Sequence, residues 1–215
     1  MMSKIISVGG GDVATVNIGG AGPLVFMGGP CAIESRDHAL EMAGRIGAIC
    51  KALDIPWIYK SCYDKDCRSS IGSFHGIGID DGLEILAEVR VTQGVPVVSD
   101  FSDAEWAAQT ATVVDFIQIP AYLCRQTHVL LAAGETGKPV HLKKGQFMSP
   151  WNMKNSVRKI ESTGNQQRRE IERLTMSIGD TKVRLIGDVM PRYCYWVVTT
   201  EGKKMPVECL QFSRE

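Results

Sequence analysis

The chain has 215 residues, 44% hydrophobic and 22% charged, and its 24 basic and 24 acidic side chains give a net charge of zero. This composition is typical of a globular protein with room for one large domain or two small ones. Nucleic acid is excluded as a partner because no basic run stands out, and a membrane because no stretch approaches the ~18–20 apolar residues of a span. The amino terminus lacks the apolar core of a signal peptide, and the seven cysteines form no CxxC pair, so we predict a reducing, cytoplasmic location.

One pattern occurs five times after a lead-in at 4–18, which is typical of a small hairpin or an irregular segment. An apolar run bounded by glycine or proline predicts a buried strand, and apolar residues at helical spacing follow it. The predicted strands are 23–31, 56–60, 95–99, 113–119 and 139–143. The predicted helices are about 36–53, 81–92, 103–112, 123–135 and 150–162. This alternation indicates an α/β fold, with a parallel sheet and crossover helices.

Each predicted strand stays apolar until its carboxyl end and then offers a reactive side chain. These residues are Cys31, Lys60, Asp100, Gln118 and Lys143. A (β/α)8 barrel of the TIM type builds its active site from such strand ends, so the series favours a barrel over an open sheet. No GxGxxG motif opens the first helix, which leaves a dinucleotide-binding fold without support.

A loop with three cations follows the strand at 56–60. The segment 59–70 carries Lys60, Lys65 and Arg68 together with three serines. Cations this close repel one another, and a bound phosphate or carboxylate would relieve the repulsion and accept their hydrogen bonds. The alternative is a solvated surface loop with nothing bound, because charged loops are common on surfaces.

Five motifs occur in the order found in one known family. They are GPCAIES at 29–35, KS at 60–61 with DK at 64–65 and RSS at 68–70, IQIPA at 117–121, CRQT at 124–127 and KKGQF at 143–147. Over about residues 23–165 the chain resembles the 3-deoxy-D-manno-octulosonate 8-phosphate (KDO 8-phosphate) synthases. Five separate motifs in one order make this resemblance far more specific than the barrel pattern alone.

The resemblance implies a transferase of KDO and lipopolysaccharide biosynthesis that condenses phosphoenolpyruvate with arabinose 5-phosphate and releases phosphate. It implies catalytic roles for Lys60, Asp100 and Lys143. It implies substrate contacts for Lys65, Arg68, Ser69, Ser70, Gln118 and Lys144, with Arg68 and the two serines on the sugar phosphate. Lys143 is preferred to Lys144 as a phosphoenolpyruvate contact because it comes first after its strand.

A metal ion is also implied, because the family has metal-dependent members with cysteine in the GPC motif and metal-free members with asparagine there. Cys31 is therefore predicted to be a ligand of a divalent ion such as Zn, Fe or Mn, although the family's remaining ligands are not found in this chain. The alternative is a small buried cysteine after a strand. The four histidines, His38, His75, His128 and His141, do not occupy family ligand positions and are predicted to be core or surface residues.

The chain departs from the family at two site positions and in its tail. Cys67 replaces the usual asparagine before the RSS motif, and Ser102 replaces a histidine after the third strand. After residue 165 the resemblance stops: 166–173 is polar and helix-like, and alternating residues around a glycine turn then predict antiparallel strands. We therefore predict an incomplete TIM-type barrel of about five βα units, with 1–165 as the synthase part and 166–215 as a divergent, β-rich tail.

Frameshift, fusion and mis-assembly all remain open as the origin of the tail, and weak or absent turnover is expected of this chain alone. A related enzyme of the DAHP synthase type, with erythrose 4-phosphate as the acceptor, is the nearest alternative function. A non-catalytic protein that binds anions or uses its tail for interaction is the alternative from a different class. If the chain is a KDO 8-phosphate synthase, a homo-oligomer like that of the family is expected.

Overall fold

The computed structural model describes residues 5–19 and 22–165 in full. Further along, it describes the backbone of five short strands, Arg168–Glu170, Leu174–Ile178, Thr181–Leu185, Trp196–Val198 and Lys204–Pro206. None of the helices among the described residues is long and apolar enough to cross a membrane.

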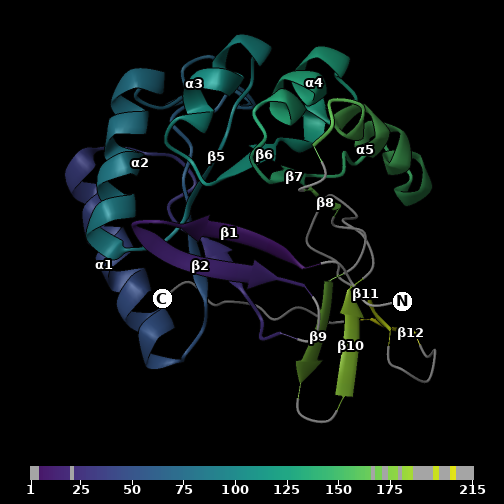
Figure 1. Cartoon of the computed structure of the whole chain (residues 1–215), viewed down its shortest axis with the longest axis horizontal. Helices are drawn as coiled ribbons and strands as arrows, with labels where there is room; N and C mark the ends of the chain where they lie inside the picture. The colour runs from purple at the N-terminus through teal and green to yellow at the C-terminus, as the bar shows by residue number, and fades with distance from the viewer. Residues whose placement is uncertain are drawn as a thin grey trace.

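A parallel sheet forms the centre of the fold, with strand order β3-β4-β5-β6-β7-β8. Its strands are β3 (Phe26–Gly28), β4 (Trp57–Lys60), β5 (Val97–Asp100), β6 (Phe116–Ile119), β7 (Val140–Leu142) and β8 (Arg168–Glu170). The sheet curls, and the helices cover its outer face (Figure 1). Within the described part of the chain, β3 and β8 are the two edges of this sheet, which therefore does not close into a barrel. The predicted α/β fold with an incomplete barrel is confirmed.

Five helices connect the strands, as the apolar periodicity predicts. They are α1 (Arg36–Ala52), α2 (Ile79–Gln93), α3 (Ala107–Ala111), α4 (Thr127–Glu135) and α5 (Met153–Glu161). Short 3-10 turns precede the last three, at η1 (Ala104–Trp106), η2 (Ala121–Leu123) and η3 (Pro150–Asn152). Ser35 caps α1 by accepting a hydrogen bond from the backbone N–H of His38, as expected for a serine at this position.

Strands β4 to β7 are buried on both faces, and the two faces have different partners. Trp57 and Tyr59 of β4 pack in the core beneath the helices, whereas Ile58 between them faces the inner side of the sheet. This is the two-residue alternation of a strand. The inner face is thus a second core, formed by Ile58, Val98 and Phe116.

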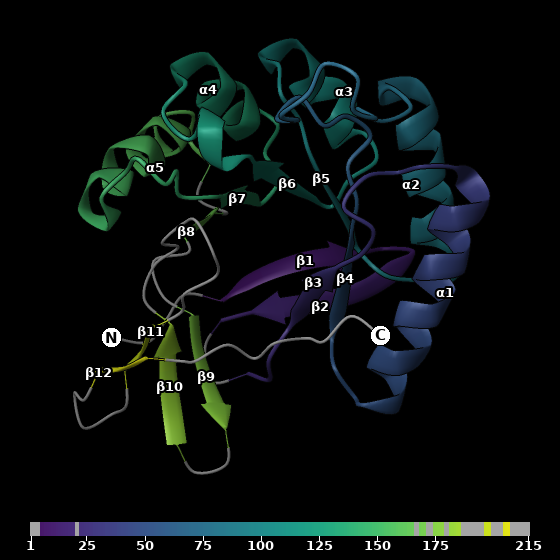
Figure 2. The same cartoon turned by 180° about the vertical axis from the view of Figure 1, so that it is seen from behind.

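A hairpin covers this inner core. It consists of β1 (Ile6–Gly10) and β2 (Val13–Ile18), which pair antiparallel, and it supplies Ile6, Val8, Val16 and Ile18. The N–H of Ala14 donates to the carbonyl of Gly94, just before β5, at 2.9 Å, so the hairpin lies at the amino ends of the strands. Figure 2 shows it crossing the inner side of the sheet, opposite the helices. The carboxyl ends are therefore left for a functional site.

The tail differs from its prediction at one place. Arg168–Glu170 is a strand parallel to β7, so the helix-like interpretation of 166–173 is wrong for these residues. The open edge of β7 offers backbone N–H and C=O groups that a neighbouring strand satisfies, and this pairing outweighs the local polar pattern.

The rest of the described tail forms an antiparallel sheet with strand order β12-β11-β10-β9. Its members are β9 (Leu174–Ile178), β10 (Thr181–Leu185), β11 (Trp196–Val198) and β12 (Lys204–Pro206). The predicted β-rich tail is confirmed for these backbone segments, although β9 was not anticipated. The division into 1–165 and 166–215 stays a prediction.

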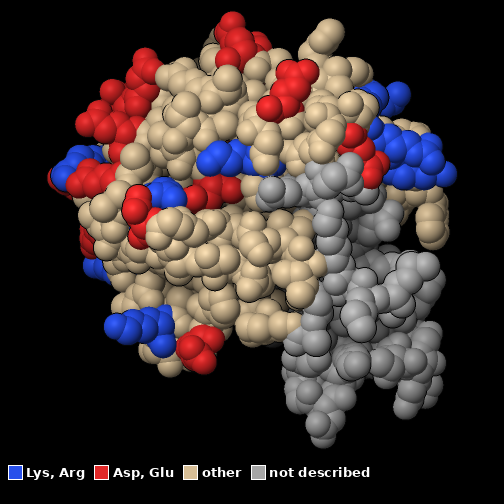
Figure 3. All heavy atoms as spheres, in the orientation of Figure 1, with Lys and Arg blue, Asp and Glu red and all other residues tan. Residues whose placement is uncertain are grey.

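Charged side chains of both signs are interspersed on the face shown in Figure 3, in keeping with the net charge of zero. The inner core, in contrast, is apolar and closed by the hairpin.

Truncation of Phe116 tests the inner core. Its side chain is 1% exposed, so Phe116→Ala is expected to lower the free energy of unfolding by about 3–5 kcal/mol through the cavity it leaves. Phe147→Ala is the matched control, because Phe147 is 60% exposed and its loss is expected to cost at most ~0.5 kcal/mol. Urea unfolding measures both, and equal effects of the two substitutions would contradict the hairpin-covered core.

Candidate active site

The turn after β4 places the predicted cationic loop against the turn after β3. The hydroxyl of Ser61 donates to the carbonyl of Pro30 at 2.7 Å, and the N–H of Ile33 donates to the carbonyl of Cys62 at 2.9 Å. Gly29 permits this approach, because a Cβ there would lie 2.4 Å from the carbonyl oxygen of Lys60. The GPC motif and the KS motif are therefore neighbours across the edge of the sheet.

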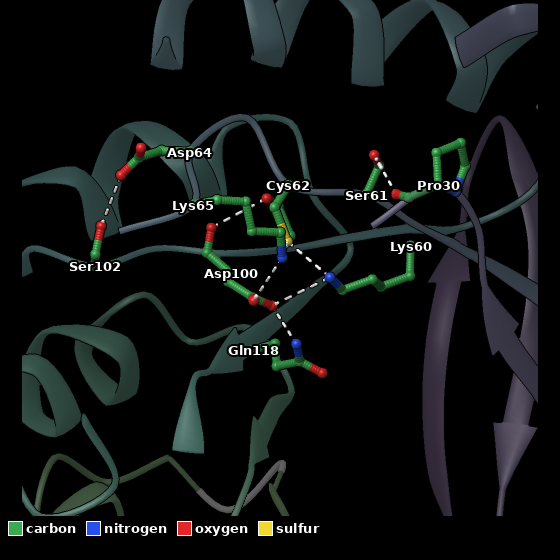
Figure 4. Close-up of polar contacts among 10 residues, drawn as sticks. Pro30, Lys60, Ser61, Cys62, Asp64, Lys65, Asp100, Ser102 and Gln118 are labelled. Atoms are coloured by element: carbon green, nitrogen blue, oxygen red, sulfur yellow. Dashed lines mark hydrogen bonds and ion pairs between the residues drawn. The ribbon is translucent and has the colours of Figure 1, made fainter. Parts of the chain in front are cut away.

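Asp100, the last residue of β5, is the centre of a charged cluster (Figure 4). The Nζ of Lys60 lies 3.8 Å from one carboxylate oxygen of Asp100, and the Nζ of Lys65 lies 3.6 Å from the other. Gln118 of β6 donates its side-chain N–H to the same carboxylate. The side chains of Asp100, Lys60 and Lys65 are only 14%, 16% and 8% exposed, so these charges interact with little screening.

The inner face of the sheet explains why these side chains meet. Lys60, Asp100 and Gln118 each follow an inner-core residue of the same strand by two positions, and alternate residues face the same side. The amino half of the inner face is therefore apolar and covered by the hairpin, while the carboxyl half is polar.

The electrostatics of the cluster keep Asp100 ionised. Burial acts to raise the pKa of Asp100, but the ammonium groups of Lys60 and Lys65 outweigh it, and the net pKa is lowered. Burial likewise acts to lower the pKa of Lys65, but Cys62 and Asp100 raise it above its usual value. Lys65 is thus expected to be cationic at neutral pH, and the cluster offers positive charge to an incoming anion.

Cys62 is a member of the cluster that the sequence analysis missed. Its Sγ accepts hydrogen bonds from Lys60 Nζ at 2.7 Å and from Lys65 Nζ at 2.9 Å, and the residue is fully buried. The spacing held a usable signal: Cys62 is two residues after a lysine that ends a strand, and side chains two apart share a face.

The two adjacent lysines after β7 have different surroundings. The N–H of Lys143 continues the sheet by donating to the carbonyl of Ile119 at 3.2 Å, and the charge of Lys143 contributes to the lowered pKa of Asp100. The ammonium of Lys144 instead donates to the carbonyls of Gly145 at 3.0 Å and Met148 at 3.2 Å in its own loop. Lys143 is exposed, and it is the one of the two lysines whose charge contributes to the lowered pKa of Asp100.

The sugar-phosphate residues predicted from the resemblance lie on an exposed loop. Arg68, Ser69 and Ser70 are all exposed, and Arg68 donates to the carbonyl of Phe74 at 3.2 Å within the same loop. A second contact holds the base of this loop: Ser102 donates to the carboxylate of Asp64 at 3.0 Å. Gly76 lies opposite Asp64 in an antiparallel bridge, with a φ of 137° that favours glycine.

A metal centre is not assembled by the residues that the structure describes. No group of three His, Cys, Asp or Glu side chains among them lies close enough to hold an ion. Cys31 is exposed, so it is not the small buried cysteine of the alternative interpretation. His141 is buried on the inner face and stacks on Phe116, with ring centroids 5.8 Å apart, while His75 and His128 are exposed. The predicted metal role of Cys31 stays a prediction.

Comparison with known proteins identifies the family. A family model described as the DAHP synthetase I family matches residues 5–191, so the chain belongs to this family. It is 50% identical over 155 residues to the 2-dehydro-3-deoxyphosphooctonate aldolase of Francisella tularensis subsp. holarctica, which covers 72% of this chain and 56% of the relative. Proteins of the same name from Granulibacter bethesdensis and Trichlorobacter lovleyi are 48% and 47% identical over 163 and 165 residues, covering 76% and 77% of this chain.

The name of these relatives denotes KDO 8-phosphate synthase, so the resemblance predicted from the sequence motifs is confirmed. The chain spans 56–59% of the length of these relatives.

Neutralisation of Asp100 tests the cluster. Asp100→Asn leaves two buried lysines without their counter-charge, so at pH 7 we expect the free energy of unfolding to fall by about 3 kcal/mol. Because the folded-state pKa of Asp100 is lowered, its stabilisation is present above the unfolded-state pKa of about 3.9 and is lost as pH falls through the folded-state value. The difference between wild type and variant should therefore shrink in acid.

Glu41→Gln is the control, because Glu41 forms an exposed helical ion pair with Arg45 that is worth less than ~0.5 kcal/mol. Denaturant unfolding at several pH values measures both variants. A difference between wild type and Asp100→Asn that stays constant down to pH ~2 would rule out the ionised Asp100.

Proposed function

We propose that the chain belongs to an enzyme that condenses phosphoenolpyruvate with arabinose 5-phosphate to give KDO 8-phosphate and inorganic phosphate. The observation that carries this proposal is the convergence of Lys60 and Lys65 on Asp100 at the carboxyl ends of parallel strands. Such strand ends are where barrel enzymes bind substrates. The names of the relatives supply the reaction class.

The charge of the cluster matches phosphoenolpyruvate. Two lysines around one carboxylate leave one positive charge, and Lys143 adds another toward the same point. Phosphoenolpyruvate carries a carboxylate and a phosphate, so it needs several cations in a small volume. Lysines provide them as point charges, and the amide of Gln118 adds an uncharged donor beside them.

The second substrate site is proposed on the neighbouring loop. Arg68, Ser69 and Ser70 are exposed and carry the donors that a sugar phosphate requires. Lys60 and Lys65 of the phosphoenolpyruvate half lie on the same continuous segment as the RSS motif. A phosphate on Arg68 and an aldehyde directed at the lysine cluster would bring the two substrates together.

Catalysis then follows from positioning and charge. The methylene carbon of phosphoenolpyruvate forms a bond to the aldehyde carbon of the sugar, and water adds to the resulting cationic carbon. The aldehyde oxygen becomes a hydroxyl by taking the proton that the water releases, and the C–O bond to phosphate then breaks so that phosphate leaves and a ketone remains. The lysines and Arg68 would hold the two anions against their mutual repulsion, and the carboxylate of Asp100 beside Lys60 and Lys65 would stabilise the positive charge that develops. In this scheme Lys144 contacts the substrate at the rim of the same site.

Cys31 is proposed as one ligand of a divalent ion that would act as a Lewis acid. Among the described residues, no group of three His, Cys, Asp or Glu side chains lies close enough to complete such a site.

Removal of single cations tests the proposal. Lys60→Ala and Lys143→Ala are each expected to weaken phosphoenolpyruvate binding by at least about tenfold, because each loses a charge-assisted contact. Lys154→Ala on the exposed face of α5 is the control and should bind as wild type does. Calorimetry measures the affinities, and undiminished binding by Lys60→Ala would refute the site.

A second candidate acceptor is erythrose 4-phosphate, because the matching family model is described as that of DAHP synthetases. Competition between the two sugar phosphates for the phosphoenolpyruvate complex discriminates between the candidates. Arabinose 5-phosphate is expected to bind more tightly, through the RSS segment at 68–70. Preference for erythrose 4-phosphate would assign the chain to the alternative reaction, and binding without phosphate release would favour a non-catalytic protein.

A further inference from the structure

Cys62 contacts both lysines of the cluster on the inner face. Lys60 and Lys65 both donate to its Sγ, at 2.7 and 2.9 Å, and Cys62 also contributes to the lowered pKa of Asp100. Its backbone is fixed as well, because Cys62 forms a parallel bridge with Ala32 in the turn after β3. We propose that Cys62 is a positioning residue that sets the directions of the two lysine ammonium groups for an anionic ligand.

The hydrogen-bond capacity of a neutral thiol fits this place. A thiol sulfur accepts hydrogen bonds through its lone pairs and donates one through its S–H. Here the lone pairs accept from Lys60 and Lys65, and the S–H remains as a donor for a neighbouring carboxylate such as that of Asp100, whose pKa Cys62 helps to lower. A thiolate would lose the donor. Burial raises the pKa of Cys62 and thereby favours the neutral form, although the two lysines oppose the shift.

The arrangement leaves donors for a ligand. Each ammonium has three N–H bonds, and the described contacts use one on Cys62 and direct another toward Asp100. One N–H of each lysine thus remains for an incoming carboxylate or phosphate. Because Cys62 holds both lysines from one atom, it fixes the spacing between these two donors. A ligand then meets groups that are already oriented, which reduces the ordering cost of binding.

Two substitutions separate this role from simple packing. Cys62→Ala removes both the acceptor and the donor, whereas Cys62→Ser keeps them on a smaller atom. Cys50→Ala is the control, because Cys50 is also buried, in α1, but belongs to the core beneath the helices. This inference rests on the proposed function only for its ligand, phosphoenolpyruvate. The lysine contacts themselves are tested without any ligand.

The first readout is hydrogen exchange of the lysine ammonium groups at constant pH by lysine-selective NMR, with signals assigned through Lys60→Ala and Lys65→Ala. Hydrogen exchange of the Lys60 and Lys65 ammonium groups should be about tenfold faster in Cys62→Ala than in wild type, and close to the wild-type rate in Cys62→Ser and Cys50→Ala. Unchanged exchange in Cys62→Ala overturns the inference, whether or not phosphoenolpyruvate binds.

The second readout is the affinity for phosphoenolpyruvate by calorimetry. We expect the affinity to be about tenfold weaker in Cys62→Ala, restored to within about threefold of wild type in Cys62→Ser, and unaffected in Cys50→Ala. Equal loss in Cys62→Ala and Cys62→Ser would show a packing role and overturn the inference. If wild type itself does not bind, the proposed function fails, and the exchange measurement alone decides the role of Cys62.

Discussion

The ionised carboxylate of Asp100 is the constraint on which the site depends. Lys60 and Lys65 are too deeply buried to be held together as like charges without a counter-ion, and Asp100 forms an ion pair with one lysine at each of its oxygens. Burial of such a group is expensive unless it is paired and hydrogen-bonded. Gln118 and Cys62 supply the additional hydrogen bonds, so the cluster remains charged inside the protein. A site that must hold a multiply charged anion needs this excess of buried positive charge.

The inner core explains how the cluster is positioned. Ile58, Val98 and Phe116 pack against the hairpin at the amino ends of their strands, and the polar residues follow two positions later. A shift of one residue in any of these strands would turn its polar site residue, Lys60, Asp100 or Gln118, away from the site and toward the helices. Burial beneath the hairpin therefore fixes the strand register, and the register brings residues from three strands to one point. The hairpin has no direct contact with the proposed chemistry but determines its geometry.

The sequence predicted the parts of this arrangement that follow from periodicity. The five βα units were expected, as was the meeting of Lys60, Asp100 and Gln118, because parallel strands place their carboxyl ends at one edge of the sheet. Contacts made by loops were not predictable in this way. Cys62 was overlooked because a buried cysteine usually behaves as a small apolar residue, and the Ser102–Asp64 bond joins loops 38 residues apart. The strand at 168–170 was missed because its pairing with β7 is not a local property.

The central claim is that the cluster around Asp100 binds a small molecule carrying both a carboxylate and a phosphate. Calorimetric titration of the wild-type chain with phosphoenolpyruvate, pyruvate and inorganic phosphate tests it most directly. The account predicts that phosphoenolpyruvate binds at least about tenfold more tightly than either smaller anion, since only it engages the lysines through both charged groups. Equal affinity for phosphoenolpyruvate and inorganic phosphate would contradict the claim and leave only a general anion site.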